Sequence, residues 1–212
     1  MLELAKFSPL QAGLLLHAGR RHLSGPGESE EALVAPWMGR VVAAQLASLA
    51  LRGHISFPFS DGRFGVYGLV ATRRRQGADA LAPEEELLLD FLFDGAMETR
   101  IARDRVDGAR QGKQLLALVR KRLRQNGLGV VRRKRYHVLK LFRCLEKAMR
   151  ENCRPVGIEW GDAPELYTAA YPFAVLFALD SGSGSWPNPP EDDFFIPSLL
   201  PYCCAHVVEE FA

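Results

Sequence analysis

Apolar residues recur at helical spacing along much of the chain, and this pattern predicts a mainly helical protein. Ser8 precedes the first such stretch as a typical N-cap, and Pro9 takes the first helical position. Gly53 and Gly127 follow two later stretches, where a left-handed residue often ends a helix. The predicted helices cover about 9–17, 36–52, 83–94, 110–126 and 136–152.

One segment alternates apolar and polar positions in the manner of β-strands. The stretch HISFPFSDGRFGVYGLV predicts a hairpin that turns at Asp61-Gly62, and Pro58 makes its first strand an edge strand. A helix, a terminal glycine and a hairpin follow one another in a winged helix-turn-helix. Gly127 repeats the helix-ending position of Gly53 in a second, weaker copy of this pattern.

The predicted fold class is therefore mainly α with short β-hairpins. We expect tandem winged-helix-like units, the first at 1–75 and the second, with its following helix, at 76–152. A C-terminal helix and an irregular segment should follow, and residues 153–212 should pack on the body of the protein.

Charge is distributed unevenly along the 212 residues, although the formal net charge is only +2. Basic and acidic side chains balance over 1–119, whereas 120–140 holds nine basic residues and no acidic one. Residues 141–212 hold four basic and eleven acidic residues. The basic window can therefore be a solvated surface that pairs with the acidic tail of its own chain.

The same window is also the strongest candidate for binding a polyanion, because basic side chains contact phosphates in winged helices. An anionic membrane surface and an unidentified protein partner are further alternatives. If the two winged-helix-like units stack side by side, the smaller basic cluster at 73–75 forms one face together with the basic window at 120–140. The candidate residues are Arg120, Arg124, Arg132, Arg133, Lys134, Arg135, Arg73, Arg74 and Arg75.

Sequence signals for catalysis, cofactors and metals are weak. The chain has no phosphate-binding glycine loop, no GxSxG and no HExxH motif. The glutamates of PEEELLLD, residues 83–90, are expected to face solvent and to stabilise a helix dipole. The four cysteines form no CxxC pair, so we expect neither a zinc site nor a disulfide framework. A non-catalytic protein without a cofactor is the prediction.

The chain contains no apolar run long enough for a membrane span, and Glu3 lies where a signal peptide would be basic. A cytoplasmic location is therefore expected.

Four motifs follow one another along the chain: FSPLQAGLLL at 7–16, LASLALRGHI at 46–55, LAPEEELLLDFLF at 81–93 and AAYPFAVLFALDSGSGSW at 169–186. Together they resemble the cytoplasmic region of a family of predicted bacterial membrane proteins, domain of unknown function 2207. The resemblance implies a bacterial relative that lacks a membrane anchor.

Three stretches, LQAGLLL, VVAAQLASLALRGHI and LVRKRLRQNGLGVV, also resemble the Golgi phosphoprotein 3 family. That family is largely helical and binds phosphoinositide headgroups, so this resemblance implies a peripheral membrane protein.

The function expected from the sequence is a non-catalytic interaction or regulatory module of a bacterial cytosolic protein, with an unidentified protein partner. Winged-helix nucleic-acid binding through 120–140 and peripheral binding to anionic headgroups are the alternatives.

Overall fold

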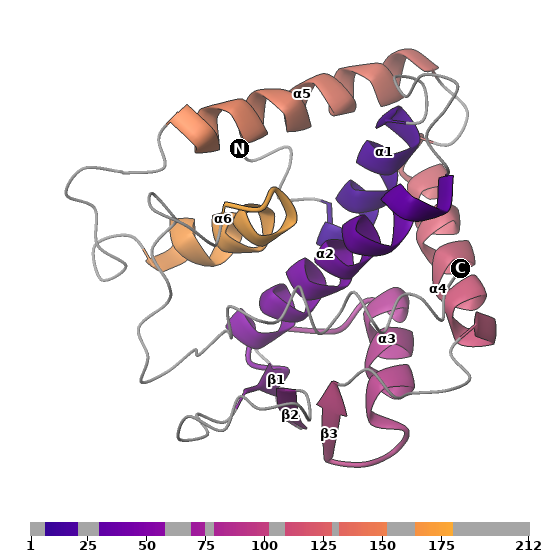
Figure 1. Ribbon diagram of the computed structural model, residues 1–212, viewed down its shortest axis with the longest axis vertical. Helices are drawn as coiled ribbons and strands as arrows, with labels where there is room; N and C mark the ends of the chain where they lie inside the picture. The colour runs from indigo at the N-terminus through magenta and orange to yellow at the C-terminus, as the bar shows by residue number, and fades with distance from the viewer. Residues whose placement is uncertain are drawn as a thin grey trace.

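The computed structural model describes residues 7–20, 30–57, 69–74, 79–101, 109–128, 132–151 and 164–179. Within these residues the protein is mainly helical, with one small antiparallel sheet (Figure 1). Its elements are α1 (Pro9–Arg20), α2 (Glu30–Leu51), β1 (Ile55–Ser56), β2 (Leu69–Arg73), α3 (Pro83–Phe93), β3 (Glu98–Ile101), α4 (Ala109–Gln125), α5 (Arg132–Glu151) and α6 (Pro164–Leu176).

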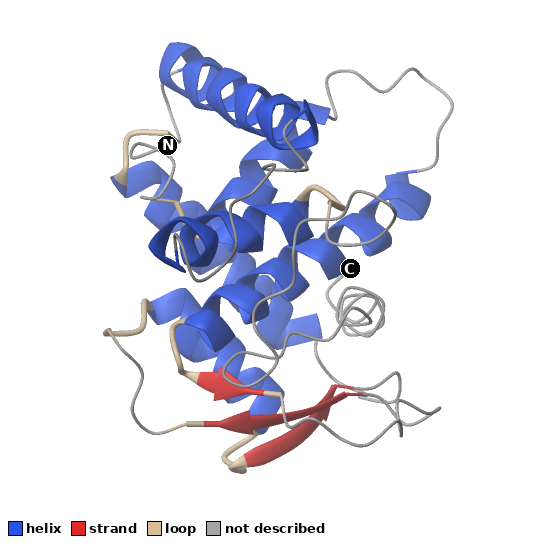
Figure 2. Ribbon diagram, turned by 90° about the vertical axis from the view of Figure 1, so that its left-hand side faces the viewer, coloured by secondary structure: helices blue, strands red, loops and turns tan. Residues whose placement is uncertain are grey.

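Helix α2 is the centre of the fold, because every residue from Val41 to Ala47 is buried on all sides of the helix. Helices α1 and α6 pack on it, α1 also contacts α4 and α5, and α3 packs against α4. Figure 1 shows α5 across one end of the molecule and the sheet at the opposite end. Figure 2 shows the same separation after a quarter turn.

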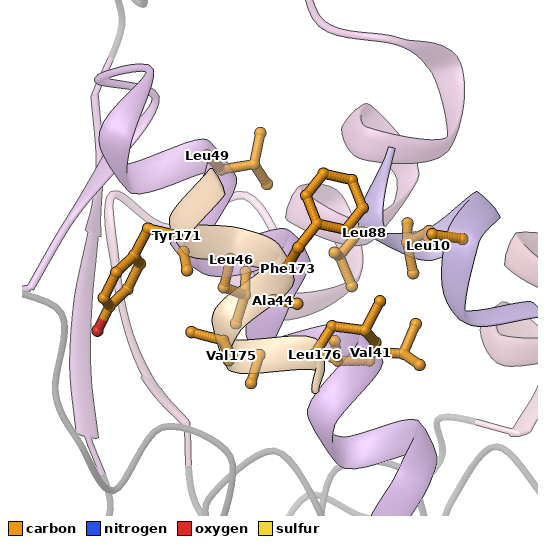
Figure 3. Packing of buried hydrophobic residues seen from close by; sticks show 14 of the residues in the cluster. Leu10, Val41, Ala44, Leu46, Leu49, Leu88, Tyr171, Phe173, Val175 and Leu176 are labelled. Carbon is orange, nitrogen blue, oxygen red and sulfur yellow. The ribbon is translucent and has the colours of Figure 1, made fainter. Parts of the chain in front are cut away.

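Two contacts position the helices around α2. Gly13 of α1 lies so close to Val41 that an added Cβ would overlap the methyl groups of this valine. On another side, every residue of α6 from Ala170 to Leu176 is buried. Figure 3 shows labelled side chains of α6 beside Ala44 and Leu46 of α2.

No helix in the described ranges combines the length and the apolar character that crossing a bilayer requires.

Three helices end with the same pair of backbone hydrogen bonds. At the end of α2, Gly53 N–H donates to Ala50 O at 2.9 Å and His54 N–H donates to Leu49 O at 2.9 Å. This is the Schellman pattern, which requires a left-handed residue, and Gly53 has φ of 76°. Gly127 ends α4 in the same way with φ of 75°, so the prediction for both glycines is confirmed.

The sheet has the order β1-β2-β3, with both pairs antiparallel. The predicted turn at Asp61-Gly62 lies outside the described residues. Ile55 pairs with Arg73. A two-residue turn at Asp61-Gly62 with an uninterrupted ladder would instead place Ile55 opposite Gly68. Strand β3 was not predicted, although Thr99 and Ile101 are buried at alternating positions.

The winged-helix detail is not confirmed. Helix α3 lies between β2 and β3 in the chain, and the sheet has no second hairpin among the described residues. After Gly127 the chain reaches α5 by Arg132, which leaves too few residues for a hairpin. The fifth helix was predicted to begin at Tyr136, and this boundary is wrong because Arg132–Arg135 form its first turn. The domain boundaries at 75/76 and 152/153 stay predictions.

Helix α6 ends with the same two hydrogen bonds, but the left-handed residue is Ala178, with φ of 61°. We expect Ala178→Gly to raise the free energy of unfolding by about 0.5–1 kcal/mol. An alanine costs about 1–2 kcal/mol in this conformation, and the greater freedom of glycine in the unfolded chain offsets part of the gain. Urea unfolding measures the change. Ala117→Gly, inside α4, is the control and should lower stability by about 1 kcal/mol; a loss at both positions would contradict the argument.

Candidate functional site

The predicted basic residues of α4 lie on its solvent side. Leu115, Val119 and Leu123 form its buried side, because they recur at helical spacing. The last turns therefore expose Arg120, Lys121 and Arg124. None of these three side chains forms an ion pair with another described residue.

Helix α5, which follows α4 in the chain, carries further exposed cations. The ammonium group of Lys134 lies beside Gly127, at the end of α4. Farther along, Tyr136, Lys140 and Arg143 are exposed at positions that share one side of a helix. We call the following residues the basic surface: Arg120, Lys121, Arg124, Lys134, Lys140 and Arg143.

The other predicted residues contribute less. Arg132, Arg133 and Arg135 belong to the first turn of α5, and their side chains lie outside the described part of the structure. Arg73 is held by Asp90, with Nη1 and Oδ1 2.8 Å apart. Arg74 is exposed, and Arg75 lies outside the described residues.

The idea of one face shared by the two basic clusters is wrong. Arg73 and Arg74 lie at the sheet, and α5 crosses the opposite end (Figures 1 and 2). The reason is the single sheet, which puts β2 beside α3 instead of beside a second hairpin.

A second site was missed by the sequence reasoning. A cavity of about 780 Å³ opens where the first turn of α1, the end of α2, the start of α3, the end of α4 and the middle of α6 meet. Its polar lining includes Gln11, Arg52, Glu84, Glu85 and Arg122, and its apolar lining includes Phe7, Pro172 and Phe173.

Two glutamates of α3 form part of this cavity, contrary to the expectation that they face solvent. Glu84 is 2% exposed and Glu85 is 3% exposed, whereas Glu86 is exposed. Three successive residues of a helical turn point in different directions, so at most part of the run can face water. Ala82, at the N-cap position of α3, has no side chain that can cap the helix. This is the one local signal that a glutamate of the first turn caps the start of the helix instead.

Glu85 has a complete set of partners. Its Oε1 accepts hydrogen bonds from Arg52 Nη1 at 2.6 Å and Gln45 Nε2 at 2.8 Å. Its Oε2 accepts from Arg52 Nη2 at 3.2 Å and from the backbone N–H of Ala82 at 2.9 Å. The carboxylate is thus compensated by a two-pronged guanidinium contact and also caps the start of α3.

Arg52 extends this contact to the segment before α3. Its Nε donates to both oxygens of Asp79 at 3.0 Å, and His54 Nε2 lies 2.9 Å from Asp79 Oδ1. Burial lowers the pKa of Arg52, but its hydrogen bonds to Glu85 and Asp79 outweigh burial and raise that pKa above its ordinary value. Desolvation likewise raises the pKa of Asp79, but hydrogen bonds with His54 and Arg52 prevail and hold it below the ordinary 3.8.

Glu84 is compensated less completely. Its Oε1 accepts a hydrogen bond from Gln11 Nε2 at 2.9 Å, and Arg122 Nε lies 4.0 Å away. The side chain of Arg122 is 46% exposed, so water screens its attraction. Gln11 is 4% exposed, and its Oε1 has no hydrogen-bond partner among the described residues.

The described residues bring together no group of three side chains suited to a metal ion. Comparison with known proteins adds no name: no family model, curated protein or solved structure matches this chain. The two resemblances noted in the sequence stay predictions.

The Arg52–Glu85 contact leads to a prediction about stability. Arg52→Met should lower the free energy of unfolding by about 3 kcal/mol, because the buried Glu85 carboxylate loses its counter-charge. Chemical denaturation measures the loss. Arg73→Met is the matched control: its partner Asp90 is 64% exposed, so the loss should stay below about 1 kcal/mol. Equal losses in the two variants would contradict the assignment.

The lowered pKa of Asp79 predicts how stability depends on pH. A carboxyl group with a lowered pKa in the folded protein stabilises the fold above its unfolded pKa and loses this effect as the pH falls through the folded value. The stability difference between wild type and Asp79→Asn should therefore be greatest above pH 4 and shrink as the pH falls below it. Urea midpoints measured from pH 7 to pH 3 test this. A difference that does not change with pH would refute it.

Proposed function

We propose that this chain is a non-catalytic interaction module that binds the phosphate backbone of nucleic acid through its basic surface. The observation that carries the proposal is the set of exposed cations around the α4–α5 corner, none of them paired with a carboxylate among the described residues. Unpaired cations at a convex corner can contact phosphates without first breaking an internal ion pair.

The packing of α5 favours nucleic acid over a membrane. A helix that binds in a membrane interface inserts its apolar side between lipids. The apolar side of α5 is already used, because Phe142 is fully buried in the protein core and Met149 is 4% exposed. Among the side chains of α5 that the structure describes, Tyr136, 69% exposed, is the one large hydrophobic residue on the outward side. A ring flanked by cations suits stacking on a base.

Binding should be sequence-independent and strongly salt-dependent. We expect wild type to bind a random-sequence duplex with an affinity that falls as salt rises from about 50 to 200 mM, because each neutralised phosphate releases counterions. Replacing Lys140 and Arg143 by Gln should weaken binding and reduce the salt slope by about two. Fluorescence anisotropy measures both quantities.

The double variant Arg73→Gln/Arg74→Gln removes the same charge at the opposite end and should leave the slope unchanged. No binding of the duplex at low salt would overturn the proposal. Binding to phosphatidylserine vesicles without binding to the duplex would also overturn it, in favour of the membrane alternative.

A further inference from the structure

The charged lining of the cavity beside α3 holds more carboxylates than guanidinium groups. Three carboxylates, from Asp79, Glu84 and Glu85, face two guanidinium groups, from Arg52 and Arg122. Arg52 is committed to Glu85 and Asp79. The remaining carboxylate, Glu84, therefore depends on the distant and half-exposed Arg122 for charge compensation.

Gln11 supplies a second acceptor at the same place. Its amide cannot be turned around, because the opposite orientation would place an oxygen against the Glu84 carboxylate. Oε1 is thus the atom left over, buried on a residue that lines the cavity. A buried oxygen without a donor is destabilising, so this position favours an incoming N–H group.

Helix α6 supplies apolar lining. Ala169, Pro172 and Phe173 line the cavity, and Phe7 adds a second aromatic ring.

We propose that this cavity binds a guanidinium or ammonium group carried on a short apolar chain. The cation contacts Glu84 and donates to Oε1 of Gln11, while the methylene groups pack on Phe7 and Phe173. A volume of about 780 Å³ lies within the range typical of small-molecule sites. The cation can belong to a small free molecule or to a basic side chain of a peptide, since either can present a guanidinium or ammonium group.

Isothermal titration calorimetry on the full chain tests the proposal with two ligands of nearly equal shape. Butylguanidinium should bind, and N-butylurea, which has a similar planar head without the charge, should bind about tenfold more weakly or worse. A blocked Gly-Arg-Gly peptide identifies the source: tighter binding than butylguanidinium supports a peptide ligand, and weaker binding supports a small free cation. Equal binding of the urea, or no binding of butylguanidinium at about 10 mM, would overturn the proposal.

Variants locate the site. Glu84→Gln keeps the shape of the side chain and should weaken butylguanidinium binding by about tenfold. Gln11→Met removes the free acceptor and should also weaken it. Glu86→Gln, on the exposed neighbour in the same helical turn, should change affinity less than about twofold. If Glu84→Gln binds as tightly as wild type, the site is wrong; if that variant is unfolded by circular dichroism, Gln11→Met decides.

Discussion

The cost of burying the Glu85 carboxylate is the constraint on which much of this structure depends. A buried charge is tolerated only with a well-aligned partner and further hydrogen bonds. Gln45 of α2 and Arg52, the first residue after α2, supply them. These contacts fix the end of α2 against the start of α3. Because Gly53 turns the chain directly after Arg52, the same anchor also determines where the sheet begins.

Local features of the fold could be predicted from the sequence because their causes are local. Ser8 and Pro9 marked the start of α1, and Gly53 and Gly127 marked two helix ends. The burial of Glu84 and Glu85 could not be predicted, since their partners Gln11 and Arg52 are 73 and 33 residues away in sequence. A glutamate that faces solvent and one that meets a distant guanidinium look identical in a single sequence. The first turn of α5 was missed for a related reason, because a run of like charges is typical of exposed loops as well as helices.

The two candidate sites have opposite character and lie on different parts of the helical body. The basic surface consists of exposed side chains with few internal partners, which suits an extended and highly charged ligand. The cavity is lined by the buried carboxylates of Glu84 and Glu85 and by aromatic rings, which suits a small cation. Arg122 lies between them, since it belongs to the basic helix α4 and lines the cavity. A ligand that displaces its guanidinium from Glu84 would release a positive charge towards the outer surface.

The packing of α6 on α2 has a consequence for how the protein is made. Arg40 of α2 donates a hydrogen bond to the carbonyl of Val175, 135 residues later in the chain. At a synthesis rate of about 5–20 residues per second, α2 leaves the ribosome roughly ten seconds before the helix that covers it. During that interval α1 is already available to pack on α2, but the side of α2 that α6 covers is exposed to water. The native packing of α2 can therefore be completed only after translation has passed α6.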